Sequence, residues 1–249
     1  DMPIVPATTP SEDEMKVAQY VRSLMHDGDC VQFGIGSLPN AIASQCMDLQ
    51  DLGLHTEMIT SALGEMIRKG VITGARKNYH PDEHIFTFSG GDQALYDTIA
   101  ADPKFRISDG SDGCNPMNIM KNDNMVSVNT CIEIDLTGQI ASEAIGPKQF
   151  SGSGGAFDFA YGALMSKGGR GIMAFTTRTK KGYSKIKSVL GAGSVVTIPR
   201  NYADYIVTEY GIAPLRGRTI RQRVNNIIAV AHPDDRAQLR KEAEKLMFL

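Results

Sequence analysis

Strand-like and helical segments alternate along almost the whole chain, and this alternation limits the fold more than any other feature of the sequence. Short apolar runs at 30–33, 54–59, 84–88, 171–176 and 205–208 have the composition of strands, and helical patterns lie between most of them. Parallel strands need a long crossover, usually a helix, to bring the chain back to the same end of the sheet. The sequence therefore predicts an α/β domain with a mainly parallel sheet flanked by helices.

The other expected elements follow from caps and apolar spacing. Ser11-Glu12-Asp13-Glu14 is a capping box, and apolar residues at helical spacing follow it as far as Met25, before Asp27-Gly28 ends the helix. A second helix is expected to begin near Pro39, a favoured first-turn residue. Further helices are expected up to Gly70 and at 93–100, 157–166, 220–231 and 234–246, and further strands at 125–136 and 194–198.

The first ten residues, DMPIVPATTP, contain three prolines and little periodicity. This composition predicts an extended linker over residues 1–10, followed by one domain over residues 11–249. The chain also starts at Asp1 with no methionine before it. These two features lead us to expect that a preceding N-terminal domain is absent.

Charge and length argue against several classes of protein. The chain has 249 residues, with 26 Lys and Arg against 28 Asp and Glu, and a formal net charge of −2. Binding to nucleic acid or to an anionic membrane surface draws on a surplus of basic groups, which this chain lacks. No apolar run approaches the roughly 20 residues that cross a bilayer, and no signal-peptide pattern starts the chain. We therefore expect no nucleic acid and no membrane among its partners.

The cysteines indicate the compartment. Cys30, Cys46, Cys114 and Cys131 form no CxxC pair, and the sequence has no Asn-x-Ser/Thr glycosylation site. In a chain of this size, such cysteines are typical of reduced, mostly buried thiols in an intracellular protein. A cytoplasmic location is expected, and a mitochondrial one stays open because the absent front end could have carried a transit peptide.

Two glycine-containing turns could bind a ligand through their backbones. Gly34-Ile35-Gly36-Ser37 connects a strand to a helix, where N–H groups can face an anion or a developing oxyanion. Pro39 stands where a dinucleotide-binding fingerprint would have its third glycine, so this turn is not such a fingerprint. Ser151-Gly152-Ser153-Gly154-Gly155 precedes another helix, and its glycines would let the backbone approach a ligand closely. An ordinary tight turn or loop is the alternative for both.

A carboxylate and a basic run are the other candidates. In the 54–59 strand, a period of two places His55, Glu57 and Ile59 on one face. A carboxylate inside an otherwise apolar strand must be paired, protonated or functional, and a salt-bridged glutamate is the plainer alternative.

Five basic residues, Lys180 among them, lie in the 178–187 segment and could bind phosphate. A solvated basic face explains such runs more often.

Two segments resemble metal sites but lack a complete set of ligands. His80 and His84 have an i,i+4 spacing, but Pro81 argues against a continuous helix and no third ligand is evident. The 109–113 segment resembles the start of a calcium loop, yet Met120 occupies the position of its closing glutamate. The sequence also lacks a GxSxG elbow and a P-loop. No metal is therefore expected.

In combination these segments resemble the acetyl-CoA hydrolase/transferase family, the group that includes 4-hydroxybutyrate, butyrate and acetate CoA-transferases. The resemblance is to the C-terminal domain of the family and covers nearly the whole chain after the linker, so it implies the CoA-transferase (NagB/RpiA-like) α/β fold of that domain. It rests on these segments in this order: GIGSLPNAI (34–42), DLGLHTEM (51–58), KNDNMVSVNT (121–130), EIDLTGQIASE (133–143), SGSGGAFDF (151–159), YIVTEYGIAPLRGRTIRQR (205–223) and IAVAHPDDR (228–236).

The resemblance implies a mechanism. In that family a glutamate carboxylate attacks the acyl-CoA thioester, giving a mixed anhydride and a CoA thiolate. The thiolate returns to form a glutamyl-CoA thioester, which the second carboxylic acid attacks. The residue that matches this glutamate is Glu57. Coenzyme A and acyl-CoA are then substrates, and no permanently bound cofactor is expected.

The resemblance also implies what surrounds Glu57. It assigns oxyanion donors to the backbone N–H of Gly155, to the side chain of Asn115, and to the backbone around Ile35-Gly36. The pocket must be dry, because water would hydrolyse the anhydride. Coenzyme A is expected along the glycine loop, with contacts from Gly152, Gly154 and Gly155, and with Lys180 as a candidate phosphate contact.

The chain departs from the family pattern at two places. Thr60-Ser61-Ala62-Leu63 stands where a Ser-Asp-Gly stretch often follows HTEM, and Ala156 stands where a glutamine often follows the paired glycines. Both are expected beside the site, so the acid specificity stays open. Members also carry an N-terminal domain, with the site between the two halves, and are commonly homodimers. The implied partners are therefore an acyl-CoA, a short-chain carboxylate, the absent half as a domain or separate chain, and a second copy.

Three functions fit this description. The first is transfer of CoA between a short-chain acyl-CoA (acetyl, butyryl or 4-hydroxybutyryl) and a free carboxylate. The second is hydrolysis of acetyl-CoA or another acyl-CoA, in which water takes the anhydride. The third is a CoA-binding half-enzyme that is inactive without its N-terminal domain. A nicotinamide enzyme fits the fold but not the glycine spacing.

Overall fold

The computed structural model describes residues 4–6 and 8–249. Its main sheet contains eight strands in the order β13-β12-β10-β5-β1-β2-β3-β4. Every neighbouring pair is parallel except β12 and β13, which form an antiparallel hairpin at one edge. The prediction of an α/β fold with a mainly parallel sheet is confirmed.

The elements have the following bounds. The helices are α1 (Glu12–Arg22), α2 (Ser37–Gln45), α3 (Ser61–Arg68), α4 (Gln93–Ala101), α5 (Gly110–Gly113), α6 (Pro116–Ile119), α7 (Ala156–Met165), α8 (Ile220–Ala229) and α9 (Pro233–Lys245). The strands are β1 (Cys30–Phe33), β2 (Gly53–Thr60), β3 (His84–Gly90), β4 (Phe105–Ile107), β5 (Met125–Asn129), β6 (Glu133–Asp135), β7 (Ile140–Ala141), β8 (Ala144–Ile145), β9 (Lys148–Gln149), β10 (Arg170–Ala174), β11 (Ile186–Lys187), β12 (Tyr205–Thr208) and β13 (Gly211–Pro214).

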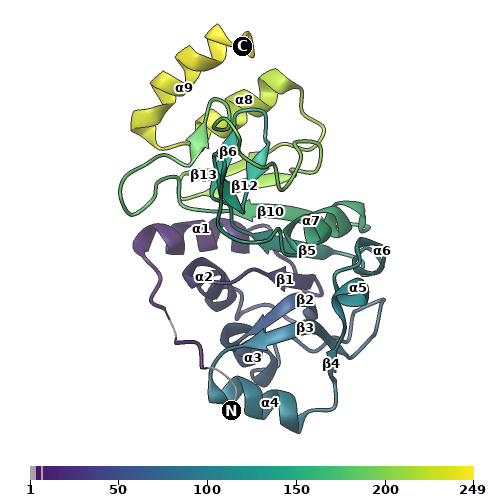
Figure 1. The fold of residues 1–249 in the computed structure, drawn as a ribbon. Helices are drawn as coiled ribbons and strands as arrows, with labels where there is room; N and C mark the ends of the chain where they lie inside the picture. The colour runs from purple at the N-terminus through teal and green to yellow at the C-terminus, as the bar shows by residue number, and fades with distance from the viewer. Residues whose placement is uncertain (1–3, 7) are drawn as a thin grey trace.

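The helices cover both faces of the main sheet. In Figure 1, α1 and α2 lie on one side of the strands, and α5, α6 and α7 lie on the other. The first side buries a large apolar cluster in which Val21 of α1 and Ile42 of α2 pack with Val31 of β1. The second side buries a smaller one, in which Ile119 of α6 and Phe159 of α7 pack against the sheet. The strands of the centre are buried on both faces, as expected of parallel strands.

Two of the expected strands differ in the structure. The 125–136 segment is not one long strand: β5 belongs to the main sheet, whereas β6 belongs to a small sheet with β7 and β11. The chain leaves the main sheet after Asn129, so an apolar run that looked continuous contributes to two cores. The 194–198 segment forms no strand, and its one ladder contact is an isolated bridge between Ile198 and Ile140. Periodicity cannot distinguish such a bridge from a strand.

Two other local expectations have mixed outcomes. The capping box at Ser11 and Glu14 is present, but α1 ends at Arg22, before Met25. Strand β2 keeps the predicted alternation only in part, because Leu54 and Ile59 both join the large apolar cluster. Strand β2 continues directly into α3, with Thr60 as the N-cap.

The start of the chain lies against the sheet. Ile4 forms a parallel bridge with Gly91, and the N–H of Val5 donates to the carbonyl of Gly91 at 2.9 Å. The extended conformation expected of this proline-rich segment is therefore present at residues 4 and 5. Residues 1–3 and 7 lie outside the described part, so the 1–10 linker stays a prediction.

The four cysteines are free thiols, three of them buried and Cys114 half-buried. Burial raises the pKa of Cys30, Cys46 and Cys131 to about 12. They are therefore protonated and unreactive at neutral pH, and the prediction of mostly buried thiols is confirmed.

The strand order changes direction at β1, near the middle of the sheet. The chain passes from β1 to β2, β3 and β4 on one side, and then returns to the other side of β1 with β5. Connections that leave neighbouring parallel strands in opposite directions open a crevice at the carboxyl ends of those strands, where α/β proteins bind ligands. The turn that contains Ile35 and Gly36 lies at the end of β1, and Glu57 lies in the carboxyl-terminal half of the adjacent β2.

His84 gives this fold a testable dependence on pH. It is 1% exposed in β3 and packs edge-on against Phe105, with ring centroids 5.1 Å apart. Burial, helped by the charge of the Lys77 ammonium, lowers the pKa of His84 to about 4. Between pH 6.5 and 4 the unfolded chain binds a proton that the folded chain does not, so stability falls as the pH falls.

We expect His84→Phe to remove that loss, because phenylalanine fills a similar volume and binds no proton. Between pH 6.5 and 5 the wild-type chain should lose about 2 kcal/mol more free energy of unfolding than the variant. Urea unfolding at both pH values measures the difference. Equal losses in the two proteins would contradict this account of His84.

Candidate active site

The centre of the candidate site is the carboxylate of Glu57. Strand β2 carries it towards the carboxyl end of the sheet, and the residues before it, 53–56, are all buried. Glu57 itself is half-buried. The site therefore presents a carboxylate at the edge of an apolar layer, where a ligand can reach it.

Gly155 holds that carboxylate from the opposite side. Its backbone N–H donates to Oε2 of Glu57 at 3.0 Å. Gly155 is the N-cap of α7, so the N-terminal end of the helix, with its partial positive charge, faces the carboxylate. This contact joins two predicted site residues that are far apart in the sequence.

The close approach depends on glycine. A Cβ added to Gly155 would lie 2.8 Å from Oε2 of Glu57 and 3.2 Å from the Phe159 ring. Gly154 has a φ of +54°, a conformation that residues with a side chain adopt at a cost. Gly152 is exposed, and a Cβ added there would meet no atom within 4 Å. The glycine loop is thus tight at its end and open at its beginning.

Two titratable groups feel the charge of Glu57. Asp158 of α7 is half-buried, and burial followed by repulsion from Glu57 raises its pKa. Burial also raises the pKa of the Cys114 thiol, and the negative charges of Glu57 and Asp158 add to the effect. Burial and the nearby negative charge thus act in the same direction on both groups.

Asn115 lies in a turn that borders the same region. It follows Cys114, whose thiol is 3.6 Å from the hydroxyl of Thr87 in β3. The side-chain carbonyl of Asn115 accepts the N–H of Met117 and caps α6, so its NH₂ group is the part left to meet a ligand. Helix α6 in turn packs on α7, where Gly162 leaves room for Ile119. The link between this turn and Glu57 is the neighbouring Cys114 thiol, which feels the Glu57 charge.

The Ile35-Gly36 turn borders a neighbouring cavity. This cavity has a volume of about 380 Å³ and is lined by the turn together with Met58 and Thr60, close neighbours of Glu57 in the chain. Gly36 has a φ of +115° and is the N-cap of α2, and Ile35 is 62% exposed. Ser61 and Ala62, where the chain departs from the family pattern, line the same cavity.

Lys180 lies in a different cleft. It is exposed and lines a polar cleft of about 600 Å³ with Ser37 and Glu14. Burial opposes ionisation of Glu14, but hydrogen bonds from Ser11 and Ser37 and the charge of Lys180 leave its pKa lowered. Lys180 therefore already interacts with a carboxylate.

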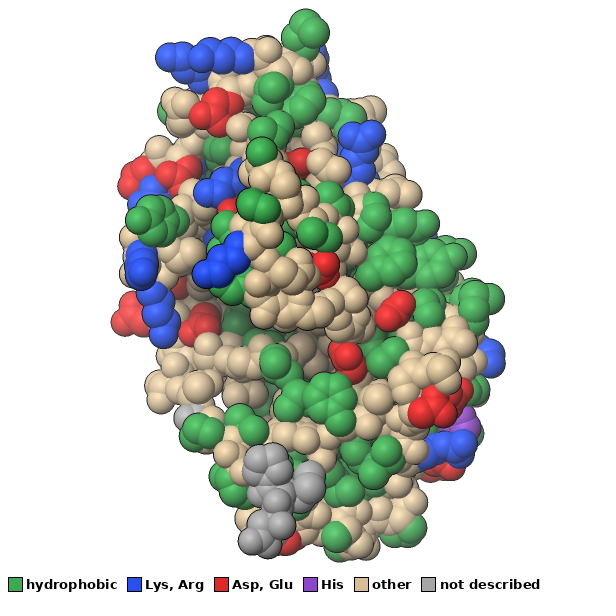
Figure 2. All heavy atoms as spheres, in the orientation of Figure 1, with side chains coloured by type: hydrophobic (Ala, Val, Ile, Leu, Met, Phe, Trp, Pro, Cys, Tyr) green, Lys and Arg blue, Asp and Glu red, His purple; other side chains and the backbone are tan. Residues whose placement is uncertain are grey.

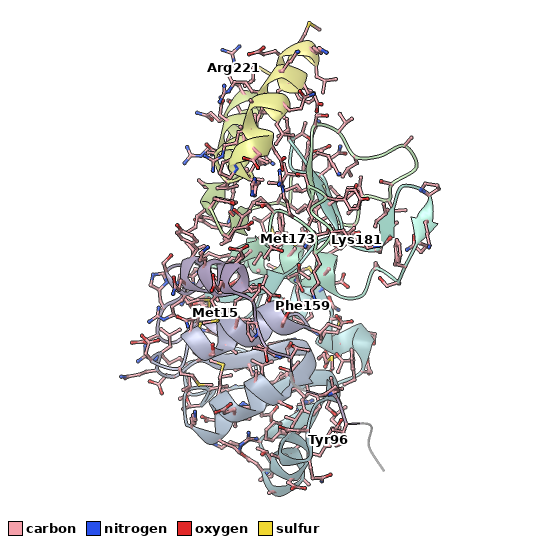
Figure 3. The ribbon with its side chains drawn as sticks, turned by 90° about the vertical axis from the view of Figure 1, so that its left-hand side faces the viewer. Met15, Tyr96, Phe159, Met173, Lys181 and Arg221 are labelled. Carbon is pink, nitrogen blue, oxygen red and sulfur yellow. The ribbon has the colours of Figure 1, made fainter. Side chains whose placement is uncertain are left out.

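Another part of the 178–187 basic run is held in an ion pair. Arg178 binds Asp235, with a 2.6 Å contact, and is not available as the sequence suggested. Figure 3 labels Lys181, the neighbour of Lys180, on the upper part of the molecule, and Phe159 where the upper and lower parts meet.

The space-filling view shows how this region looks from outside. Figure 2 shows a hollow across the middle of the face, between the upper and lower parts, with hydrophobic and acidic side chains along it. Exposed apolar side chains occur on the segments around the carboxyl ends of the strands: Ile35, Phe88, Ile107 and Met117. In the described residues, this edge of the sheet is open to solvent.

Sequence reasoning missed three residues around Glu57. Asp158 and Phe159 follow Gly155 in the quoted SGSGGAFDF segment, and their helical spacing from Gly155 could have placed them beside it. His55 was placed on the Glu57 face of the strand without a role. The structure buries it completely and gives both ring nitrogens partners, which no pattern in the sequence indicates.

Neither a metal group nor a membrane span is found in the described part of the chain. In residues 4–6 and 8–249, no three His, Cys, Asp or Glu side chains are grouped as a metal ion would need. His80 has a φ of +51°, so His80 and His84 do not share a helix. No helix in the same residues is both long and apolar enough to cross a bilayer.

Comparisons with known proteins assign the chain to a family. A model of the family described as "Acetyl-CoA hydrolase/transferase C-terminal domain" matches residues 91–243. The 4-hydroxybutyrate coenzyme A transferase of Clostridium kluyveri is 42% identical over 233 residues, which is 93% of this chain and 54% of the relative. The chain thus spans about half the length of the curated relatives it matches.

Solved structures show the same relationship. A 4-hydroxybutyrate CoA-transferase from Porphyromonas gingivalis is 41% identical, with a TM-score of 0.85, over 98% of this chain and 58% of that one. The crystal structure of RipA from Yersinia pestis is 37% identical, with a TM-score of 0.94, over 99% of this chain and 56% of that one. The chain therefore belongs to the acetyl-CoA hydrolase/transferase family and carries its C-terminal domain.

Proposed function

We propose that this chain is the catalytic half of a CoA-transferase that moves CoA between a short-chain acyl-CoA and a free carboxylate. One observation carries the proposal: the N–H of Gly155 donates to the Glu57 carboxylate at 3.0 Å, at the N-terminus of a helix and beside a buried apolar layer. The similarity to 4-hydroxybutyrate CoA-transferases supports the choice of reaction.

Glu57 acts as the nucleophile. Its carboxylate attacks the thioester carbonyl of the acyl-CoA, and the C–S bond breaks to give a mixed anhydride and CoA thiolate. The thiolate then attacks the glutamyl carbonyl, which forms the glutamyl-CoA thioester and releases the first acid as its carboxylate. The second carboxylate reverses these two steps with its own acyl group, and Glu57 returns to its starting state.

Gly155 is suited to stabilise the steps that occur at the glutamyl carbonyl. When a thiolate or carboxylate adds to Cδ of Glu57, negative charge develops on a glutamyl oxygen. The N–H of Gly155 already contacts Oε2, one of the two oxygens on which that charge can develop. A donor that is in place before the reaction need not reorganise, which is the basis of oxyanion stabilisation.

The other candidate residues have roles around this pair. We propose that the NH₂ group of Asn115 is a second oxyanion donor, because its carbonyl is already used as a helix cap. The backbone at Ile35-Gly36 and the open start of the glycine loop, Gly152 and Gly154, are proposed contacts of CoA. Lys180 is the proposed phosphate contact, and binding there would have to compete with Glu14 for its charge.

Several features of the whole protein are proposals of the same kind. The relatives' length supports a second half that covers the open carboxyl edge and excludes water from the anhydride, with residues 11–249 as the C-terminal catalytic domain after a 1–10 linker. A homodimer and a cytoplasmic location rest on the resemblance and the cysteine usage. We propose no permanently bound cofactor, since the reaction needs only the carboxylate and CoA.

Covalent trapping tests the proposed nucleophile. The chain, alone and joined to the N-terminal half of the Clostridium kluyveri relative, is incubated with butyryl-CoA and then with borohydride. Borohydride reduces a glutamyl thioester to the alcohol, so the peptide with Glu57 should lose one oxygen and gain two hydrogens. Peptide mass spectrometry locates the change, because no other carboxylate has been activated.

Two variants control this experiment. Glu57→Gln should abolish the modification, whereas Glu244→Gln should leave it intact, because Glu244 is exposed on α9, a helix that carries none of the proposed site residues. Modification that persists in Glu57→Gln would refute the assignment. Absence of any modification in the joined protein would refute the glutamyl thioester altogether, and release of acid without an acceptor would indicate the hydrolase.

Gly155→Ala tests the second half of the pair. The added methyl would lie 2.8 Å from Oε2 of Glu57 and displace the carboxylate from the N–H. We expect the trapping rate to fall roughly 10²- to 10³-fold, as when one oxyanion donor is lost. Gly110→Ala is the matched control, since Gly110 is exposed, lies outside the proposed site, and its methyl would meet nothing within 4 Å. Similar rates for the two variants would show that the loop is not part of the site.

A further inference from the structure

His55 lies two residues before Glu57 in β2 and is completely buried. Its Nε2–H donates to the carbonyl of Gly113 at 2.8 Å. Its Nδ1 accepts from the side-chain NH₂ of Asn122 at 3.1 Å. Both ring nitrogens therefore have partners, and the two bonds together require the neutral tautomer with its proton on Nε2.

The partners of His55 belong to the segment that carries the Asn115 turn. Gly113 ends α5 and directly precedes Cys114 and Asn115. Asn122 follows α6, and its amide is oriented because its Oδ1 accepts the N–H of Tyr79 at 3.4 Å. The His55 side chain thus forms hydrogen bonds with Gly113, before the Asn115 turn, and with Asn122, after α6. It attaches both ends of this short segment to β2.

His55 also contacts helix α7, whose N-cap residue Gly155 binds the Glu57 carboxylate. Its ring meets Phe159 of α7 edge-on, with centroids 6.0 Å apart, and lies nearly parallel to Tyr79 at 6.1 Å. Phe159 is close to Gly155: its ring would be 3.2 Å from a Cβ at that position, and its N–H donates to the Gly155 carbonyl at 2.9 Å. The three segments that border the Glu57 carboxylate therefore all meet at one imidazole.

We propose that His55 is a positioning residue that fixes the 113–115 turn and α7 relative to the Glu57 strand, so that the side chain of Asn115 and the N–H of Gly155 stay aimed at the reacting carbonyl. The effect on rate rests on the proposed function. The attachment of the 113–115 turn and α7 to β2 through His55, called the lock below, is a property of the fold. His55 touches no reacting atom, and it acts through Gly113, Asn122 and Phe159.

The chemistry of histidine suits this task. A neutral imidazole is a donor at one edge and an acceptor at the other, with a flat apolar face between, so it can bridge two polar partners inside an apolar layer. Burial lowers the pKa of His55 to about 4, with a smaller contribution from the Lys77 charge, so the tautomer persists at neutral pH. Removing the ring nitrogens would leave the Gly113 carbonyl and the Asn122 amide buried without these partners, which costs stability locally.

The test compares three variants. His55→Phe keeps a ring against Tyr79 and Phe159 but loses both hydrogen bonds. His55→Gln keeps a neutral donor and acceptor. His84→Phe is the matched control, because His84 is also buried in the sheet with a pKa lowered to about 4, but its contact is with Phe105.

Two readouts are needed. Hydrogen–deuterium exchange on the 249-residue chain follows the amides of 113–122, and needs no turnover. Steady-state transfer in the joined protein gives kcat and KM for butyryl-CoA. For His55→Phe we expect faster exchange confined to 113–122, a kcat lower by roughly 10- to 100-fold, and a KM changed by no more than about threefold. His55→Gln should restore most of both, and His84→Phe should alter neither.

The outcomes separate this inference from the proposed function. Unchanged exchange at 113–122 in His55→Phe, or a similar increase in His84→Phe, would overturn the lock whatever the enzyme does. Faster local exchange with unaltered kcat would overturn its role in positioning. If the wild-type protein shows no Glu57 trapping, the proposed function fails, and the exchange data still decide the lock.

If His55→Phe does not fold, NMR of the wild-type imidazole tests the two hydrogen bonds of His55 directly. Nitrogen NMR should show a neutral ring with its proton on Nε2 at pH values well above its pKa of about 4. A ring protonated on Nδ1, or one that titrates near the ordinary pKa of about 6.5, would contradict the two hydrogen bonds.

Discussion

The hydrogen bond between the Gly155 N–H and the Glu57 carboxylate is the contact on which the site depends. It holds a negative charge at the edge of the apolar layer by giving it the N-terminal end of α7 as a partner. The bond requires that residue 155 have no side chain and that β2 and α7 meet at the carboxyl end of the sheet. Burial and the nearby Glu57 charge together raise the pKa values of Asp158 and Cys114.

The topology explains why these segments meet. Because the chain builds β2, β3 and β4 on one side of β1 and returns with β5 on the other, the carboxyl ends of the central strands border one crevice. Helix α7 then crosses back over the sheet on the face opposite α1 and α2 (Figure 1), which brings the glycine loop to β2. The buried His55 ties the intervening α5–α6 segment to the same strand. The sheet fixes the position of Glu57, and the loops carry the proposed hydrogen-bond donors.

Much of this could be predicted from the sequence, and the limits have physical causes. The alternation of elements predicted the sheet, and the motifs singled out Glu57 and Gly155, which prove to be in contact. Periodicity failed at 125–136 because one apolar run serves two cores, and at 194–198 because an isolated bridge has the same apolar pattern as a strand. The role of His55 was invisible, because its partners lie far away in the sequence and are a backbone carbonyl and an amide. The ion pair between Arg178 of the 178–187 basic run and Asp235 was equally invisible, because the two residues are far apart in the sequence.

The most direct measurement of the central claim is a crystal structure of the protein, joined to the second half that its relatives possess, after reaction with an acyl-CoA. The account predicts a bond between the CoA sulfur and Cδ of Glu57, with the glutamyl oxygen within hydrogen-bond distance of the Gly155 nitrogen. CoA bound with its sulfur far from Glu57, or a glutamyl thioester whose oxygen faces away from Gly155, would contradict it.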